Sequence, residues 1–176
     1  MAEELGRSRT FSNLVSVPIA VRPVEPSDMG DVIRLSLRAW APVHASMAAA
    51  LGPQINSRVY PDWASSQAAD VQAACQDHGV SVSVAVDDQT VVGFVAVLVN
   101  TADKAGEIDM IAVDPRAQGR GVAHALTEHA LAQMRTAGCD LAVIATGGDE
   151  GHAPARALYE SEGFTPLPLV RYYRQL

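Results

Sequence analysis

The sequence predicts an α/β domain with a mixed central sheet and helices on both faces. Strand-like segments are followed by a helix, a strand, a second helix and a last strand, an order that packs helices against a sheet. The nearly all-apolar run from Val91 to Val99 is typical of a central strand covered on both faces. At 176 residues, the chain is long enough for one domain with a substantial core.

Composition narrows the class of function. The chain is 48% hydrophobic and has a net charge of −7 with thirteen Lys plus Arg. Nucleic-acid binding needs a clustered basic face, and none is visible, so we expect no nucleic-acid partner. This balance suits a small cationic substrate better. Two cysteines, Cys75 and Cys139, favour a reducing compartment over a disulfide framework.

The chain carries no membrane signal. Its start includes Glu3 and Glu4 and lacks the basic start and apolar run of a signal peptide. The run from Val91 to Val99 is about half of the ~20 residues that a spanning helix requires. We therefore expect a soluble cytoplasmic protein without a membrane partner.

The N-terminal segment, residues 1–17, is interpreted as a tail or arm before a single domain, residues 18–176. These first residues are polar and show no steady periodicity. Residues 19–24 form the first predicted strand, and Pro23 favours an edge position for it.

Two helices are predicted in the first third of the chain. The first begins with Ser27 as its N-cap and is interrupted at Pro42, and residues 43–60 are irregular. The second opens at Pro61 and closes at Gly79. Residues at helical spacing mark the buried face of the first helix: Ile33, Leu37 and Trp40.

The middle of the chain predicts three strands. Residues 80–86 alternate between valine and small residues, so we expect a strand with one polar face. Residues 87–89 make the turn into the apolar strand, 91–99. After a polar loop, residues 107–113 form the next strand. Period-two geometry puts four of its side chains on one face: Glu107, Asp109, Ile111 and Val113.

The last third supplies the remaining elements. A helical run covers residues 122–134, and residues 141–145 form a strand. A second helix over residues 154–162 is ended by Gly163. Residues 169–173 are predicted as a short final strand.

A turn between strand and helix carries the clearest chemistry. Gly119 and Gly121 let the backbone bend tightly, and the helix that follows has free N–H groups and a partial positive charge at its start. Such a turn binds phosphate well. Arg116 and Arg120 add guanidinium groups that suit phosphate oxygens.

The spacing Arg-x-x-Gly-x-Gly, directly after a strand ending at Pro115, resembles the acyl-CoA pyrophosphate loop of the GNAT acetyltransferase superfamily. The segment Ala-Leu-Tyr-Glu-Ser-Glu-Gly-Phe, residues 157–164, resembles a segment late in that fold, at the family's usual separation. The resemblance covers nearly the whole chain. It implies a GNAT-like, mostly antiparallel sheet and an acetyl-CoA-dependent N-acetyltransferase. Only twelve residues follow Phe164, so we expect the family's closing hairpin to be abbreviated and partner contacts or dimerisation to differ from the family's.

The resemblance also implies the contacts with acetyl-CoA. Backbone N–H groups of residues 118–123 would hold the pyrophosphate, and residues 111–113 would pair with the pantetheine amides. Where the family has an asparagine, this chain has His152, which would contact CoA, act as a second base or lie exposed in its loop. The expected cofactor-binding residues are Ile111, Ala112, Val113, Arg116, Gln118, Gly119, Arg120, Gly121, Val122, Ala123, His152 and Ala155.

Acetyl transfer from a thioester to an amine needs a neutral amine and a protonated leaving thiolate. The resemblance places Tyr159 beside the CoA sulfur as general acid; otherwise it is a half-buried aromatic on a helix face. Glu107 matches the position of a base in some GNAT members, and partial burial would raise its pKa. Otherwise it is a strand-end carboxylate that caps a loop or meets an arginine.

The acceptor site is expected under the first two helices. By resemblance, Trp40, Tyr60 and Trp63 are pocket residues, with ordinary core packing as the alternative. Asp149 and Glu150, together with Glu107 and Asp109, would give the site an acidic field that favours cationic amines, although loop acids are usually only solvated.

The expected acceptor is a primary amine of a small molecule. A protein N-terminus or lysine is the alternative acceptor, and a non-catalytic acyl-CoA-binding regulatory domain is the alternative function. A second copy of the chain, in a homodimer, is a further candidate partner.

Two other site types are disfavoured. Gly119-x-Gly121-x-x-His124 superficially resembles a dinucleotide fingerprint, but a histidine replaces the third small residue. His124 and Glu128 share a helix face, yet a third convergent metal ligand is lacking, so we expect no metal.

Overall fold

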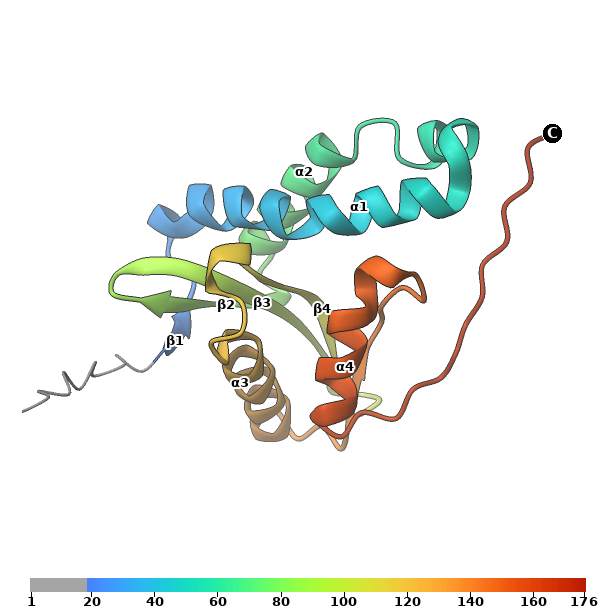
Figure 1. The fold of residues 1–176 in the computed structure, drawn as a ribbon. Coiled ribbons are helices and arrows are strands. Elements are labelled where there is room, and N and C mark those ends of the chain that lie inside the picture. The colour runs from blue at the N-terminus through green and yellow to red at the C-terminus, as the bar shows by residue number, and fades with distance from the viewer. Residues whose placement is uncertain (1–18) are drawn as a thin grey trace, which may run out of the picture.

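The computed structural model describes residues 19–176 and shows a five-stranded sheet with helices on both faces (Figure 1). The strands follow chain order across the sheet, each antiparallel to the one before except β5, which is parallel to β4. The predicted mixed, mostly antiparallel α/β sheet is therefore confirmed. The predicted N-terminal arm lies outside the described residues. The strands are β1 (Ala20–Pro23), β2 (Val80–Asp87), β3 (Thr90–Asn100), β4 (Ala105–Val113) and β5 (Leu141–Ile144).

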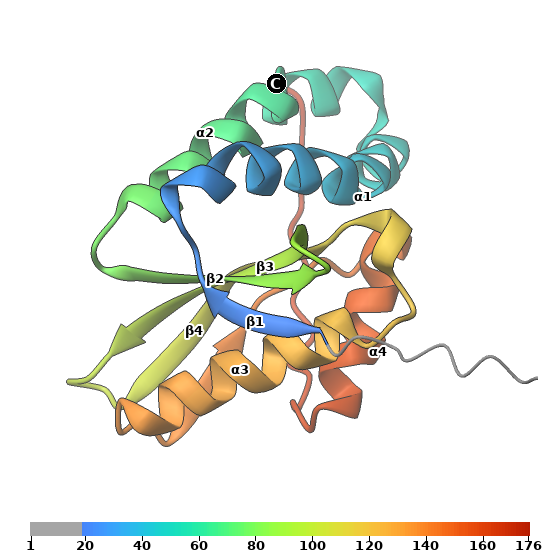
Figure 2. The same ribbon diagram turned by 90° about the vertical axis from the view of Figure 1, so that its left-hand side faces the viewer.

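The helices form two layers, with α1 and α2 on one side of the sheet and α3 and α4 on the other (Figure 1 and Figure 2). Three short 3-10 turns, η1 to η3, precede α1, α3 and α4. The helices are α1 (Met29–Val59), α2 (Trp63–Gln76), α3 (Val122–Thr136) and α4 (Ala153–Ser161), and the turns are η1 (Pro26–Asp28), η2 (Pro115–Ala117) and η3 (Glu150–His152).

Each face of the sheet has its own core. Phe94 of β3 packs with Val32 and Leu35 of α1, whereas Val95 packs with Leu126 of α3. Alternate residues of β3 thus enter opposite cores, as the apolar run predicts. The central position of this strand is confirmed.

The predicted polar face of β2 is wrong. Ser83 and Ala85 are both buried on the α3 side. The Ser83 hydroxyl lies 3.0 Å from Nε2 of His129 on α3, which satisfies it without water. In the sequence, a buried serine that pairs with a helix side chain therefore gives the same alternating pattern as a serine that faces solvent.

The helix break predicted at Pro42 is also wrong, because α1 continues through it. Residues 43–60, predicted to be irregular, are mostly helical. The helix changes direction at Gly52, whose φ of 73° only glycine adopts readily, and Pro53 starts the second part. A proline costs one helical hydrogen bond, and packing on the sheet and η3 offsets that loss in so long a helix.

The predicted start and buried face of α1 need correction. Ser27 is not its N-cap, since η1 precedes the helix and the Asp28 carboxylate accepts the Glu25 N–H at 2.8 Å. Asp28 also pairs with Arg22 of β1 at 2.6 Å, which joins the helix to the sheet. The fully buried residues of α1 are Val32, Leu35 and Ser36; the predicted Ile33, Leu37 and Trp40 are only partly buried.

The predicted last strand, residues 169–173, is absent. After Phe164 the chain has no regular structure and runs up the side of the molecule away from β1 (Figure 1). Residues 169–173 pair with no strand of the described sheet, and Pro166 and Pro168 just before them have no N–H groups with which to start such pairing. Within residues 19–176, no helix combines the length and apolar character needed to cross a membrane.

Candidate active site

The sheet opens between β4 and β5. The two strands pair only over Ala105–Ile108 and Leu141–Ile144. Beyond Ile108, this edge of β4 has no strand partner in the described part of the chain. The predicted cofactor-pairing residues, 111–113, lie on this unpaired length. An extended ligand with amide groups can add to such an edge as another strand would.

A bulge at Asp109 changes the faces of β4. Register shifts here, because Ile108 and Met110 are opposite consecutive residues of β3. Ile111 joins the core under α3, and Met110 joins the core under α1. The prediction that Glu107, Asp109, Ile111 and Val113 share one face is therefore wrong. Glu107 is exposed, so the partial burial expected for it is wrong too.

The loop before α3 has the geometry of an anion site. Gly119 and Gly121 have φ values of 72° and 78°, in the left-handed region. No backbone N–H of residues 118–123 donates to another described residue. A Cβ built on either glycine would have no neighbour within 4 Å, so the space beside the loop is open. Free donors and the α3 N-terminus thus face an open space.

The two loop arginines are held by carboxylates. Arg120 contacts Asp87 at 2.7 Å, and Arg116 contacts Asp114 at 2.8 Å. Their side chains remain 48% and 77% exposed, respectively, so both can turn toward a bound anion. A cavity of about 220 Å³ lies beside them and is lined by both arginines and Thr90.

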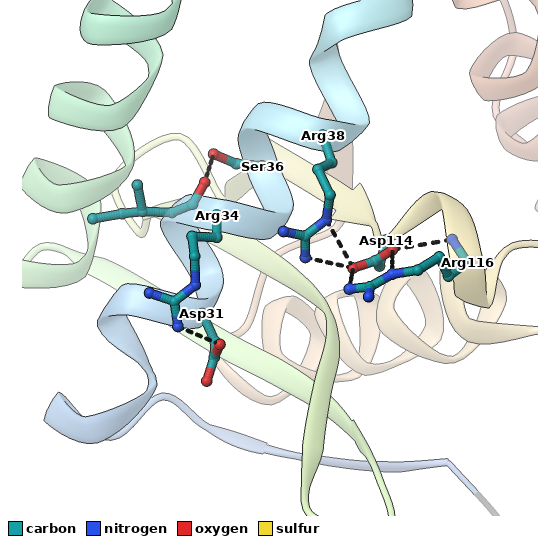
Figure 3. Close-up of polar contacts among 7 residues, drawn as sticks. Asp31, Arg34, Ser36, Arg38, Asp114 and Arg116 are labelled. Carbon is teal, nitrogen blue, oxygen red and sulfur yellow. Dashed lines mark hydrogen bonds and ion pairs between the residues drawn. The ribbon is translucent and has the colours of Figure 1, made fainter.

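Asp114 joins this loop to α1 (Figure 3). Its buried carboxylate accepts hydrogen bonds from Arg116 Nε and the Arg116 backbone N–H, both at 3.0 Å, and from Arg38 Nη2 at 2.6 Å. Hydrogen bonds from Arg116 hold its pKa well below the ordinary value; burial opposes this effect, and Arg38 adds to it. Sequence reasoning missed Arg38.

Tyr159 of α4 has a buried ring, packed edge to face against Phe164 at 6.0 Å. Burial raises its pKa to about 12. The hydroxyl has no hydrogen-bond partner among residues 19–176. Its oxygen is not fully buried, because it is absent from the buried unpaired polar atoms of those residues. The ring is therefore fixed by packing, while the hydroxyl is left available to a ligand.

His152 does not lie exposed in its loop. Its Nδ1 is 2.5 Å from the Asp149 carboxylate, and its side chain is largely buried. Burial would raise the pKa of Asp149, but hydrogen bonds from Ser46 and His152 lower it overall. Gly151 donates its N–H to Ser46 of α1 at 2.9 Å. The loop before α4 is thus tied to α1, and Asp149 is not a free solvated acid.

The predicted aromatic residues separate into two places. The ring centroid of Trp40 lies 6.3 Å from that of Phe94, and Trp40 packs on the core under α1. This agrees with the alternative that Trp40 is an ordinary core residue. Trp63 stacks on His44 at 4.3 Å, and Tyr60 meets the same ring edge to face at 5.4 Å. Burial, and then the nearby His152, lower the pKa of His44. Sequence reasoning missed this histidine.

The two histidines of α3 each contact another side chain. His124 contacts Glu162 at 2.5 Å, and His129 contacts Ser83. No group of three or more metal-binding side chains occurs within residues 19–176.

Comparison with known proteins identifies the family of the chain. Residues 51–164 match the model of the Acetyltransferase (GNAT) family. The chain belongs to this family. The resemblance to the GNAT acetyltransferase superfamily is thereby confirmed.

Similarity to curated relatives covers only part of the chain. The chain is 47% identical over 68 residues to a mycothiol acetyltransferase of Beutenbergia cavernae, covering 39% of this chain and 22% of the relative. It is 39% identical over 70 residues to a mycothiol acetyltransferase of Thermobispora bispora, covering 40% and 23%. The matched part is thus about a fifth of the length of these relatives.

Solved GNAT structures share the fold over most of the chain. A putative acetyltransferase of the GNAT family from Desulfovibrio desulfuricans superposes with a TM-score of 0.68 at 23% identity, covering 89% of this chain and 92% of that one. An aminoglycoside 6'-N-acetyltransferase from Acinetobacter haemolyticus gives 0.64 at 15% identity, covering 89% and 98%. PaiA N-acetyltransferase from Thermoplasma acidophilum, solved with coenzyme A, gives 0.63 at 14%, covering 85% and 91%.

Proposed function

We propose that this GNAT-family protein transfers an acetyl group from acetyl-CoA to a primary amine of a small molecule. The observation that carries the proposal is the order of two features along the chain. An unpaired strand edge, residues 109–113, runs directly into a loop with open backbone donors at the start of α3. Acetyl-CoA has the matching order, with amide groups in its pantetheine arm followed by a pyrophosphate.

Tyr159 is the proposed general acid. The amine nitrogen attacks the thioester carbonyl carbon, and the carbon–sulfur bond breaks as the tetrahedral intermediate collapses. The departing thiolate then needs a proton. A phenol with a pKa of about 12 stays protonated at neutral pH, so it can donate a hydrogen bond to the sulfur and transfer its proton as negative charge develops there; the phenolate then regains a proton from water.

Glu107 is the proposed base, acting through water. The amine must lose a proton, and an alkyl ammonium group has a pKa near 10. Glu107 is exposed near the point where β4 and β5 separate, so water can link it to an amine there. His152 is the second candidate, because its contact with Asp149 uses Nδ1 and leaves Nε2 for another partner.

Support for a small-molecule acceptor comes from the relatives. The matched curated proteins are named for mycothiol, and one fold neighbour is named for aminoglycosides. Another fold neighbour is a ribosomal-protein-alanine N-acetyltransferase, so the fold by itself does not separate these classes. Tyr60 and Trp63 supply an aromatic wall beside the loop of Asp149, whereas Asp109 and Glu107 are the exposed acids that would favour a cationic amine.

The test is acetyl-CoA turnover, followed by thiol release, with an amino sugar, an aminoglycoside, a polyamine and a peptide with a free N-terminus. The proposal predicts turnover with at least one small amine and little with the peptide. Turnover with the peptide alone would replace it with the protein-amine alternative. Tight acetyl-CoA binding without turnover of any amine would favour a non-catalytic acyl-CoA-binding domain.

A further inference from the structure

We propose that His124 is a further cofactor-binding residue, whose protonated ring donates a hydrogen bond from Nε2 to the pyrophosphate of acetyl-CoA. Glu162, at the end of α4, keeps this ring charged, so that cofactor affinity depends on pH. The inference rests on the acetyl-CoA site proposed above and adds to it a side chain that the loop motif does not include.

The position of His124 puts it within reach of the loop. Gly121 is the N-cap of α3, so His124 is the third residue of the helix. Helical side chains lean toward the helix N-terminus, and a long side chain at this third position reaches back to the N-cap N–H in a capping box. His124 can therefore approach a ligand held by the N–H groups of residues 118–123. Its side chain is 64% exposed, which leaves the ring accessible.

The charge pattern at the start of α3 is the reverse of the usual one. The first turn has no acidic residue. An acid there would be stabilised by the helix dipole, whereas a cation is unfavourable. A charged His124, next to a loop that already carries Arg116 and Arg120, therefore costs helix stability unless an anion binds at the same place. This pattern favours a ligand-binding role over a structural one.

Glu162 is the group that makes His124 a cation. His124 Nδ1 lies 2.5 Å from Glu162 Oε1, and the Glu162 side chain is only 7% exposed. A buried carboxylate is costly unless it is paired with a charge, and His124 is the partner that the structure provides. The contact uses Nδ1, so the Nε2 N–H of the imidazolium remains for a ligand.

The pair predicts the direction of the pH dependence. The hydrogen bond with Glu162, together with its negative charge, raises the pKa of His124; desolvation opposes this effect, and Glu128 on the same helix adds to it. His124 is therefore charged below this pKa and loses its charge as pH rises through it. Above it, the Glu162 carboxylate has no counter-charge near the pyrophosphate. Both changes weaken anion binding as pH rises.

The first test is the dissociation constant of acetyl-CoA, measured by calorimetry from pH 6 to pH 9 for the wild type and His124→Gln. At each pH, the ratio of the two constants cancels the titration of the ligand's own 3'-phosphate. We expect His124→Gln to bind about three- to tenfold more weakly at pH 6, between the effects of an exposed ion pair and a charge-assisted hydrogen bond. The ratio should approach one at pH 9. His78→Gln, at an exposed histidine in the turn before β2, is the control and should leave the constant unchanged.

A second variant separates charge from packing. His124→Lys keeps a positive charge over this pH range, so it should bind as tightly as the wild type at pH 6 and more tightly at pH 9. Dephospho-CoA, which has the pyrophosphate and lacks the 3'-phosphate, should give the same ratio for His124→Gln as acetyl-CoA does. A ratio near one for His124→Gln at pH 6, with either ligand, would overturn the proposal. A wild type that binds neither ligand would contradict the cofactor site itself.

The protonation of His124 can be measured without turnover, by NMR titration of its ring in the free protein and in the complex with CoA. Binding and protonation are reciprocally linked, so a ligand that prefers the charged ring must raise its pKa. We expect a higher pKa for His124 in the complex than in the free protein, and a lower one in Glu162→Gln than in the wild type. A pKa of His124 that CoA leaves unchanged would exclude contact between this charge and the cofactor.

Discussion

At the residue scale, Asp114 accepts several hydrogen bonds that connect the loop before α3 to α1. Its carboxylate is buried, yet it receives hydrogen bonds from two arginines on different segments, α1 and η2 (Figure 3). The arginines themselves remain partly exposed, so their charges stay hydrated. A buried acid with charged donors of this kind stabilises more than an exposed pair does.

Replacing the Asp114 charge should therefore lower stability. We expect Asp114→Asn to lower the free energy of unfolding by about 1.5 to 3 kcal/mol, the range for a hydrogen bond to a charged group. Urea unfolding at pH 7 measures this. The control is Asp31→Asn, which removes an exposed contact with Arg34 on the same helix and should change the free energy by less than about 0.5 kcal/mol. Equal effects of the two substitutions would contradict this role.

The same carboxylate predicts a pH dependence. Folding lowers the pKa of Asp114, so its contribution to stability is complete above its unfolded pKa of about 3.9 and is lost as pH falls through the folded pKa. The difference in unfolding free energy between the wild type and Asp114→Asn should stay constant from about pH 8 to 5 and shrink below about pH 4. A difference that grows on acidification would refute the assignment.

Removal of the Tyr159 hydroxyl alone tests its catalytic role separately from cofactor binding. Its ring is packed and its hydroxyl is free, so Tyr159→Phe should keep the fold and the acetyl-CoA dissociation constant. If the hydroxyl is the acid, the turnover number should fall roughly 10²- to 10⁴-fold. Steady-state kinetics and calorimetry measure the two quantities. Tyr172→Phe, at an 89% exposed ring, is the control. An unchanged turnover number for Tyr159→Phe would remove the acid role.

Local patterns predict some of these residues and not others. Tyr159 and the loop glycines lie within short motifs, so their placement could be predicted from neighbouring residues. Arg38 is 76 positions from its partner Asp114, and no local pattern connects them. The predicted first helix ended at Pro42, before His44. The stacking of His44 on Trp63 could therefore not be predicted from local sequence.

At the element scale, the contact between α3 and β3 holds the loop in place. A Cβ on Gly93 would lie 2.9 Å from the Ala112 carbonyl oxygen and 2.9 Å from Leu126. The backbone oxygen cannot move away without shifting β4. The close approach of helix and sheet at this point therefore requires glycine.

Gly93→Ala should separate these elements. We expect a loss of about 1 to 3 kcal/mol in unfolding free energy, typical of overpacking, and a fall in melting temperature of roughly 2 to 12 °C. The control is Gly148→Ala, because a Cβ there would meet nothing within 4 Å. Differential scanning calorimetry of both variants decides this. A stable Gly93→Ala protein would mean that the sheet yields more easily than the packing indicates.

Most elements lie close to their predicted places, because their apolar periodicity is strong over many residues. The apolar strand of β3 and the helix of α3 are the best examples. Two features depend on contacts made only in the fold. The bulge at Asp109 reverses the side-chain alternation that a regular strand would have, and the packing of α1 overrides the proline within it.

At the scale of the whole molecule, the two edge strands of the sheet differ in how readily they could pair with another strand. β1 is a short edge with Pro23 and an ion pair to Asp28, features that limit further pairing. β5 is the opposite edge, and its apolar residues Leu141 and Val143 are exposed. The last strand, residues 169–173, was predicted from local sequence alone, and local sequence does not show whether a strand edge lies within reach.

Acetyl-CoA binding is the central claim, and thermal unfolding tests it most directly. Acetyl-CoA at a hundred times its dissociation constant should add about 2.7 kcal/mol of stability and raise the melting temperature by roughly 5 to 11 °C. Free CoA should act similarly, and NAD should have no effect. An absence of any shift with both CoA species, or an equal shift with NAD, would contradict the cofactor site at the β4 edge and the loop before α3.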